Sequence, residues 1–369
     1  MKILADAHIP YLRGVAEQFG DVEYLPGNQF SRESIHDKDA LIVRTVTRFD
    51  EAILSGSRVK LICSATIGYD HIDTAYCDSH NIAWRTAPGC NANSVEQYVT
   101  ASLLHLAAKY HFKLEEKIIG IVGVGNVGSK VAAACEKLGM KVLLNDPPRE
   151  EREGPTLFTD IESIKREADI ITFHTPLTRS GKYSTFHLAD ETFFASVARQ
   201  PFIINAARGG VTANPALVRA WHDKKISGVV IDCWENEPEI DKELLSLADI
   251  ATPHIAGYSA DGKWNATKIS LENLNAYFDI GVNPHFHTIP LPREPDINMR
   301  NIAKDQQLAR AVYHTYDPLL ETEELKKSPG KFYHFRSHYP LRREYPAYSV
   351  YEAETSISKI LADLGFLVK

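Results

Sequence analysis

Three polar side chains in the second half of the chain have the types that acid–base chemistry on a small carboxylic acid requires. They are Arg208 in INAARGG, Glu237 in DCWENEP and His254 in TPHIAG. An arginine can bind a carboxylate through two parallel N–H donors. A histidine can accept and return a proton near neutral pH, and a nearby glutamate favours its protonated form. This set predicts proton transfer beside a bound carboxylate.

A glycine-rich segment, GVGNVG, precedes these residues and is typical of a dinucleotide site. It follows an apolar run that predicts a strand and leads into a predicted helix. Gly123 permits a tight turn, Gly125 lets the backbone approach a pyrophosphate, and Gly128 lets helix and strand pack closely. The N-terminus of the following helix would attract the phosphates. The predicted cofactor-binding residues here are Gly123, Gly125, Asn126, Val127 and Gly128.

Asp146 ends the next apolar run and predicts which nucleotide binds. A carboxylate there would bond the ribose hydroxyls and repel a 2′-phosphate, which favours NAD over NADP, although Arg149 lies close in the sequence. Asp232 is a candidate for binding the nicotinamide carboxamide. With NAD beside Arg208 and His254, the predicted reaction is hydride transfer from a hydroxy acid, and it requires no metal.

Each of these residues also has a simpler interpretation. Arg208 could pair with a structural carboxylate, and the acidic stretch ENEPEIDKE around Glu237 has the composition of a solvated loop. The chain contains 15 histidines, most of which need no catalytic role. The joint occurrence of three suitable residues at successive predicted strand ends favours the catalytic interpretation, because ligands bind at that edge of a doubly wound sheet.

The apolar pattern predicts two α/β regions that would position these residues. In the first 90 residues, MKILAD, ALIVRT and KLICSA read as parallel strands. A long helix is expected after residue 92, with Val95, Val99 and Leu103 on one face and Ser94 with Gln97 as a capping box. From about residue 115 the alternation restarts, and a further helix is expected from 264. The strands predicted in this second region are KIIGIVGVG, KVLLND, DIITFHTPL, PFIINAARG, GVVIDCW and DIATPHI.

Composition limits the class of protein. The length of 369 residues predicts two or three domains, and 44% hydrophobic with 24% charged residues is typical of a globular protein. A net charge of −7 argues against a nucleic-acid partner. No segment reads as a signal peptide or a membrane span. The five cysteines have no C-x-x-C spacing, which argues against a zinc site and favours a cytoplasmic location.

The motifs together resemble the D-isomer-specific 2-hydroxyacid dehydrogenases over roughly residues 40–280. They are ATIGYDHID, GCNANSVEQYV, GIVGVGNVGSKVA, HTPLT, NAARGG, DCWENEP and TPHIAGYS. The resemblance implies an α/β fold of two doubly wound, Rossmann-like parallel-sheet domains around a cleft. It places a discontinuous substrate domain at 1–92 and 264–284, and the NAD-binding domain at 93–263. It also implies that Arg208, Glu237 and His254 are the catalytic residues.

The same resemblance assigns further ligand contacts. For substrate it implies Thr45, Thr66 and Tyr258. For the cofactor it adds residues of the motifs that follow later strands, namely Thr175, Ala206, Ala207, Arg208, Asp232 and Gly257.

The tail from residue 285 to 369 differs in character, with many aromatic and basic residues. It resembles a small α+β dimerisation domain found in a branch of the family that acts on a phosphorylated four-carbon hydroxy acid. We therefore expect a homodimer formed through 285–369, since Tyr, Phe and Arg are enriched at interfaces. Stacking on single-stranded nucleic acid is the less favoured alternative. Candidates for holding the substrate phosphate are Gly68, Arg44, and Arg342 or Arg343 from a partner subunit.

Two other functions fit the motifs. One is a different D-2-hydroxyacid dehydrogenase, acting on 3-phosphoglycerate, glyoxylate or hydroxypyruvate. The other, from a different class, is an NAD(H)-sensing corepressor-type protein that binds the cofactor without turnover, because fold alone does not fix function.

Overall fold

The computed structural model describes residues 1–369, which form two compact units. The first unit comprises Met1–Asn91 and Ser259–Pro290, and the second comprises Ala92–Tyr258 and Leu291–Lys369. The residues from Leu291 onward thus pack with the region of the glycine-rich segment. The division into three domains expected from the sequence stays a prediction.

The first unit is built on a five-stranded parallel sheet. Its strands are β1 (Lys2–Asp6), β2 (Asp21–Leu25), β3 (Ala40–Val43), β4 (Leu61–Ser64) and β5 (Ala83–Arg85). Their order is β2-β1-β3-β4-β5 and all pairs are parallel. The order in which the chain adds strands therefore reverses between β1 and β3. In such sheets the carboxyl ends of the strands at the reversal form a natural ligand site.

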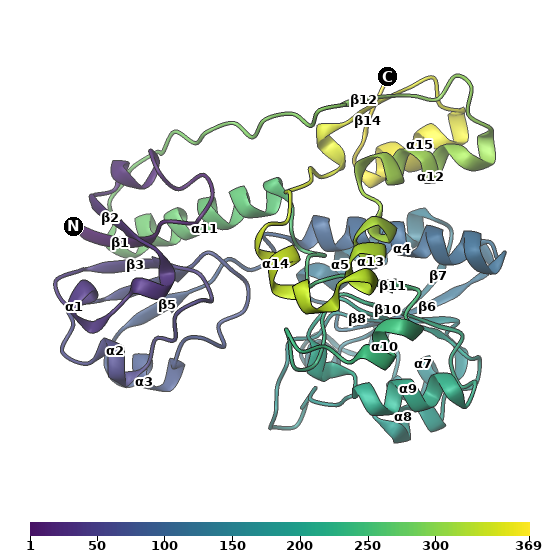
Figure 1. The fold of residues 1–369 in the computed structure, drawn as a ribbon, viewed down its shortest axis with the longest axis horizontal. Helices are drawn as coiled ribbons and strands as arrows, with labels where there is room; N and C mark the ends of the chain where they lie inside the picture. Colours follow the sequence, from purple (N-terminus) through teal and green to yellow (C-terminus); the bar gives the residue numbers. More distant parts are fainter. The chain divides into compact units, whose positions relative to one another are not determined.

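Helices cover both faces of this sheet (Figure 1). They are α1 (Arg32–Ile35), α2 (Glu51–Leu54), α3 (Thr74–Ser79) and α11 (Ala260–Phe278). The first three begin where Ser31, Asp50 and Asp73 accept a backbone N–H, as N-cap residues do. Successive residues of β1 point to opposite faces, Leu4 toward α1–α3 and Ile3 toward α11, so both faces are apolar.

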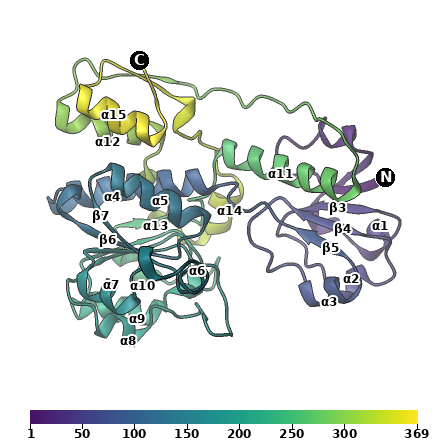
Figure 2. The ribbon, with the colours of Figure 1, turned by 180° about the vertical axis from the view of Figure 1, so that it is seen from behind.

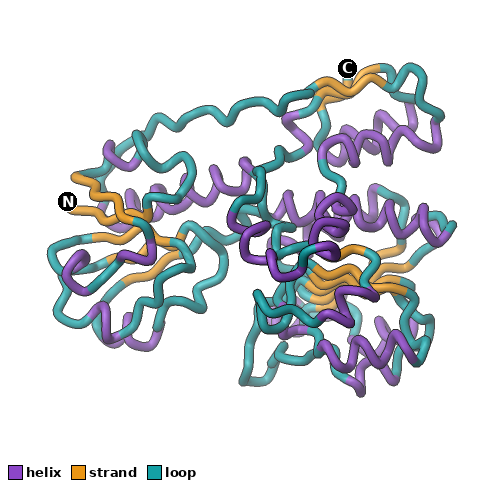
Figure 3. Tube along the Cα trace, viewed as in Figure 1, coloured by secondary structure: helices purple, strands orange, loops and turns teal.

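The second unit contains a six-stranded parallel sheet, drawn in orange in Figure 3. Its strands are β6 (Ile118–Val122), β7 (Lys141–Asn145), β8 (Ile170–Phe173), β9 (Phe202–Asn205), β10 (Gly228–Ile231) and β11 (Ile250–Ala251). The order is β11-β10-β9-β8-β6-β7, which reverses between β6 and β8. This is the doubly wound arrangement in which a dinucleotide binds at the reversal.

Helices also cover both faces of the six-stranded sheet. They are α4 (Ala92–Tyr110), α5 (Asn126–Lys137), α6 (Pro147–Glu153), α7 (Ile161–Glu167), α8 (Glu191–Ala195), α9 (Asn214–His222) and α10 (Lys242–Leu247). Figure 1 shows α4 and α5 on one side and α7–α10 on the other. The predicted capping box at Ser94 and Gln97 is wrong, because α4 already begins at Ala92 and Ser94 donates to the Ala256 carbonyl.

The C-terminal segment forms a small α+β layer within the second unit. Its elements are β12 (Asp296–Asn298), α12 (Lys304–Thr315), α13 (Pro318–Lys327), α14 (Phe332–Ser337), β13 (Ser349–Tyr351), α15 (Thr355–Leu364) and β14 (Leu367–Val368). The strands form a parallel sheet in the order β12-β13-β14. Helices α12 and α15 lie over α4 and α5, as Figure 2 shows from behind, and α13 packs against β11. Their apolar side chains join the core of the second unit.

The strands expected from the apolar runs are all present, and β2 and β5 are additional strands of the first sheet. The predicted α/β class with two Rossmann-like parallel sheets is confirmed, as is a C-terminal region with its own small sheet. No helix has both the length and the apolar character needed to span a bilayer.

Candidate active site

The turn between β6 and α5 has the geometry that a dinucleotide requires. Gly123 has a φ of 89°, and a Cβ there would lie 2.8 Å from the backbone of His174 and Thr175 after β8. A Cβ on Gly128 would lie 1.9 Å from the Gly123 carbonyl oxygen, so only glycine fits. A Cβ on Gly125 would meet no atom within 4 Å. The turn is therefore closed on the protein side and open where a pyrophosphate would approach.

Unpartnered polar groups surround this open turn. Helix α5 begins after Gly125, which has no side chain to cap the first N–H groups, and these can instead bind an anion. The Thr175 hydroxyl and the His174 Nδ1 atom are buried without a hydrogen-bond partner, and burial lowers the His174 pKa to about 3. Buried polar groups normally have partners, so a bound ligand would complete them. The residues at this edge thus fit a bound NAD, which would supply the hydride acceptor.

Asp146 is fixed at the end of β7, facing the same turn. Its carboxylate accepts the N–H of Val124 at 2.8 Å and the N–H of Arg149 at 3.0 Å. The Arg149 guanidinium pairs with Glu153 at 2.7 Å and is therefore engaged within α6. An anchored carboxylate beside an arginine that is already paired favours ribose hydroxyls over a 2′-phosphate.

The structure brings Glu237 and His254 into direct contact. Both carboxylate oxygens of Glu237 lie within hydrogen-bond distance of His254 Nδ1, at 2.9 and 3.0 Å. Oxygen Oε1 also accepts the Trp234 N–H at 2.9 Å. Burial opposes ionisation of Glu237, but the hydrogen bond and charge of His254, the Trp234 N–H and Arg336 outweigh it, and its pKa is lowered. The interpretation of Glu237 as part of a solvated acidic loop is wrong, since its side chain is only 18% exposed.

Asp232 shapes the loop that carries His254. It is 1% exposed, and its Oδ1 atom accepts the Thr252 hydroxyl at 2.7 Å and the N–H groups of Ile255 and Ala256 at 2.7 and 3.1 Å. Burial raises its pKa. These bonds help hold His254 at a backbone φ of 57°, a conformation that residues other than glycine rarely adopt. The carboxamide contact of Asp232 stays a prediction.

Arg208 follows β9, which neighbours β10, the strand that leads to Glu237; β11, which leads to His254, lies on the far side of β10. Its Nη1 donates to the Ala207 carbonyl at 2.8 Å, and Asn205 bonds both the Arg208 carbonyl and the Ala207 N–H. The neighbouring Gly209 packs directly on the Trp234 carbonyl, where a Cβ would lie 1.9 Å away. Since β9, β10 and β11 are parallel neighbours, the loops of all three residues meet at one sheet edge. The remaining predicted cofactor residues, Thr175, Ala206 and Gly257, belong to loops after strands of this sheet.

The predicted substrate contacts Thr45 and Thr66 lie in the first unit. Thr45 is exposed after β3. The Thr66 hydroxyl lies 2.7 Å from that of Ser64 and donates to the Gly68 carbonyl. Arg44, a candidate for the phosphate, pairs with the buried Asp6 at 2.8 Å at the reversal of the sheet. These roles, and that of Tyr258 in the second unit, stay predictions.

Known proteins match the chain along its whole length. The NAD binding domain of the D-isomer specific 2-hydroxyacid dehydrogenases matches residues 91–256, and a domain of unknown function matches residues 288–365. Erythronate-4-phosphate dehydrogenases of Bacteroides thetaiotaomicron, Porphyromonas gingivalis and Escherichia coli are 50%, 45% and 40% identical to it. The alignments cover 95%, 100% and 99% of this chain, and 99%, 100% and 98% of the relatives. The chain belongs to the erythronate-4-phosphate dehydrogenase family.

Solved structures share the fold of this dehydrogenase. D-lactate dehydrogenase from Aquifex aeolicus, complexed with NAD and lactic acid, has a TM-score of 0.63 at 23% identity and covers 79% of this chain and 100% of its own. The 3-phosphoglycerate dehydrogenase of Entamoeba histolytica, with NAD⁺ bound, has a TM-score of 0.64 at 24% identity, covering 76% and 96%. The predicted family resemblance and the NAD cofactor are confirmed.

The C-terminal segment of the dehydrogenase corrects one expectation. Arg342 was a candidate to reach a substrate phosphate in a partner subunit, but it is only 9% exposed. Its guanidinium donates to the carbonyls of Ser94, Ile255, Ala256 and Tyr258 within its own chain. Because these carbonyls engage its guanidinium, Arg342 cannot reach a substrate in a partner subunit. The same hydrogen bonds attach the C-terminal segment to the loop after His254.

The same segment contributes one contact that the sequence did not suggest. Arg336 Nη1 lies 3.3 Å from Glu237 Oε2. Nothing in the local pattern distinguishes Arg336 from the other basic residues of the tail, and only the folded chain selects it.

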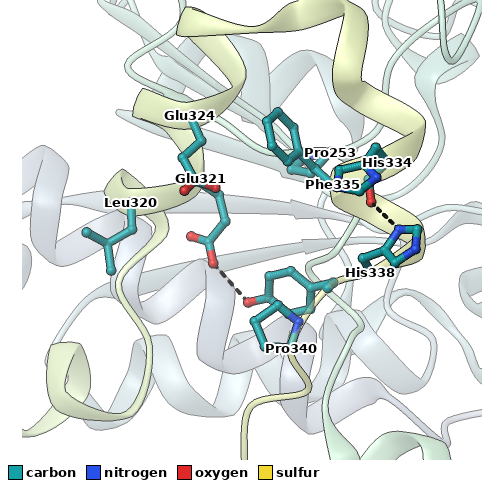
Figure 4. Close-up of a pocket in the computed structure, with 9 residues that line it drawn as sticks. Pro253, Leu320, Glu321, Glu324, His334, Phe335, His338 and Pro340 are labelled. Carbon is teal, nitrogen blue, oxygen red and sulfur yellow. Dashed lines mark hydrogen bonds between the residues drawn. The ribbon is translucent and has the colours of Figure 1, made fainter.

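A pocket of about 210 Å³ also lies beside the loop that carries His254 (Figure 4). Its lining comes from α13 and the region around α14, plus the residue before His254. The lining residues are Pro253, Leu320, Glu321, Glu324, His334, Phe335, His338, Tyr339 and Pro340. Glu321 accepts the Tyr339 hydroxyl there at 3.0 Å, and burial raises its pKa. The structure assembles no group of three His, Cys, Asp or Glu residues that could bind a metal.

Proposed function

We propose that the chain oxidises 4-phospho-D-erythronate with NAD to 3-hydroxy-2-oxo-4-phosphooxybutanoate, a step of pyridoxal phosphate (vitamin B6) biosynthesis. The observation that carries this is the contact of His254 with Glu237, at the nucleotide edge of a chain that is 50% identical over nearly its full length to a relative of that name. The C2–H bond would break with transfer of hydride to NAD. The C2 hydroxyl proton would pass to His254, leaving a ketone, NADH and a protonated imidazole.

The other candidate residues, at the carboxyl ends of the strands and in the first unit, have distinct roles in this proposal. Arg208 binds the substrate carboxylate and polarises the adjacent C2 oxygen. Glu237 orients the imidazole through Nδ1, which leaves Nε2 to face the hydroxyl, and stabilises the imidazolium that forms. Asp146 binds the adenosine ribose, and the α5 N-terminus binds the pyrophosphate. Thr45, Thr66 and Tyr258 contact the substrate.

The decisive experiment is NADH formation by purified protein with NAD and 4-phosphoerythronate, with 3-phosphoglycerate run in parallel. A single-turnover measurement accompanies it, because slowly released NADH would hide steady-state turnover. Activity with 4-phosphoerythronate alone supports the proposal. Activity with 3-phosphoglycerate alone would keep the mechanism and refute the substrate. Tight NAD binding with neither activity would favour a cofactor-sensing role.

We further infer that the protein is a cytoplasmic homodimer. Its five cysteines are all buried and none forms a disulfide, as expected in a reducing compartment. The C-terminal segment exposes large apolar side chains, among them Leu320 at 66% and Tyr333 at 69%, which a second copy could cover. The proposed partners are thus a phosphorylated hydroxy acid and a second copy of the chain.

A further inference from the structure

Arg336 links the C-terminal segment to the catalytic pair. Besides its ion pair with Glu237 at 3.3 Å, its guanidinium bonds the Tyr258 side chain, and its Nε atom is buried without a partner. Its position is fixed by packing, since Phe332 at the start of α14 is buried in the same core as Trp234. Arg342, a few residues later, ties the chain to the carbonyls after His254.

We propose that Arg336 is a positioning residue that orients Glu237 toward His254 and, by its charge, favours the neutral imidazole that accepts the substrate proton. This inference rests on the proposed function, because it concerns the same acid–base step. It also gives a role to the domain of unknown function that matches residues 288–365, which would complete the catalytic site of the NAD-binding domain in the same chain.

The charges around the pair indicate the direction of the effect. The groups that interact by charge with Glu237 or His254 are Asp232, Cys233 and Arg336. Arg208 lies within the charge field of Cys233, and Tyr258 bonds Arg336. Glu237 contacts the imidazole and Asp232 acts on it through its charge, so both carboxylates attract positive charge to this position. Arg336 opposes them, because it shares the Glu237 carboxylate and repels a second positive charge. The Arg336 side chain is 32% exposed and that of Glu237 is 18% exposed, so water screens this charge pair only in part.

The geometry also favours an orienting role. Glu237 Oε1 accepts the Trp234 N–H, while Oε2 lies close to both His254 Nδ1 and Arg336 Nη1. Without Arg336, one oxygen of the carboxylate loses a charged partner, and the carboxylate becomes freer to rotate away from the imidazole. The side chain of Arg336 thus acts through Glu237 and does not need to touch the reacting atoms.

The test compares Arg336→Gln and Arg336→Lys with Arg310→Gln, which removes the same charge from an exposed position in α12. In Arg336→Gln, we expect the acidic limb of the kcat/KM profile for oxidation to move to higher pH by about one unit, and activity below that limb to fall about tenfold. Arg336→Lys should retain most of the parent profile. Arg310→Gln should match the parent throughout, and the NADH dissociation constant should be unchanged in all three variants.

A second measurement does not depend on the substrate. The imidazole of His254, labelled with ¹³C and assigned with a His254→Gln variant, is titrated by NMR in the parent and in each variant. Its midpoint should move to higher pH in Arg336→Gln alone. The proposal would be overturned if a folded Arg336→Gln protein kept both the parent NMR midpoint of His254 and the parent position of the acidic limb of the kcat/KM profile. If the parent fails to oxidise 4-phosphoerythronate, the proposed function fails, and the NMR titration still decides the role of Arg336.

Discussion

At the scale of single residues, the proposed proton carrier, His254, is held by groups that fix its orientation. His254 touches Glu237 through Nδ1 only, and the loop that carries it is tied to Asp232 by hydrogen bonds to Ile255 and Ala256. A ring held from one side presents its other nitrogen in a fixed direction. The expected consequence is that the imidazole contributes to catalysis and contributes little to cofactor binding.

We expect His254→Gln to lower kcat for 4-phosphoerythronate oxidation by about 10²–10⁴-fold, since general base catalysis typically supplies that factor. NADH affinity should change little, because the proposed sites for the phosphates and the ribose are Gly125, α5 and Asp146, away from His254. Stopped-flow turnover and a fluorescence titration with NADH measure the two quantities. A large loss of NADH binding with unchanged kcat would contradict the assigned role.

At the scale of elements, the proposed cofactor site depends on the β6–α5 turn, and helix α4 carries a buried carboxyl that affects stability. The turn requires glycine for two different reasons. At position 128 only glycine fits, because a Cβ would overlap the Gly123 carbonyl oxygen. At position 125 a Cβ would meet no protein atom, and glycine there leaves space for a ligand. Substitutions at these two positions should therefore fail in different ways.

We expect Gly125→Ala to leave the melting temperature of the cofactor-free protein within a few degrees of the parent, because the new methyl meets no protein atom. NADH binding should weaken by about tenfold or more, since the methyl occupies the approach of the pyrophosphate. Gly128→Ala should instead lower the melting temperature, because its methyl overlaps the Gly123 carbonyl. Thermal unfolding and NADH titration of both variants test this, and equal effects of the two on unfolding would refute it.

A buried carboxyl in α4 should make stability depend on pH. Burial raises the pKa of Glu96 to about 8 from its ordinary 4.5, despite a hydrogen bond from Thr100. Between these values the folded protein holds a proton that the unfolded chain releases. The stability that this bound proton contributes to the fold is fully present below pH 4.5 and is lost as the pH rises through about 8.

We therefore expect the melting temperature of the parent to fall between about pH 5 and about pH 9, and Glu96→Gln to flatten much of that decline. Glu136→Gln, at an exposed site on α5, is the matched control and should follow the parent. Calorimetric scans across this range provide the measurement. A Glu96→Gln protein with the parent slope would show that Glu96 is ionised in the fold.

At the scale of the whole molecule, the C-terminal segment is part of the nucleotide-binding unit. Ile297, Val312 and Val350 are fully or almost fully buried in the same core as α4 and α5. Deleting the segment would therefore expose that core, and a truncated protein could not distinguish a lost dimer from a damaged fold. Point changes on the exposed surface of the segment provide a cleaner test.

If the segment forms a homodimer, Leu320→Glu combined with Tyr333→Glu should give a monomer in size-exclusion light scattering, because the charges would enter the interface. Leu157→Glu, at an exposed apolar site outside the segment, should leave the dimer intact. A dimer that survives the double change would place the interface elsewhere. A monomeric parent would refute the assembly itself.

The sequence by itself determined the two α/β regions, the nucleotide turn and the positions of Arg208, Glu237 and His254 at strand ends. These features depend on local patterns, and parallel strands bring their carboxyl ends to one edge. The tertiary structure alone decided that Glu237 is paired rather than solvated, and that Ser94 lies inside a helix. It also decided that Arg336, 99 residues from Glu237 in the sequence, contacts the Glu237 carboxylate. Contacts over such separations depend on how the segment packs, which local patterns do not encode.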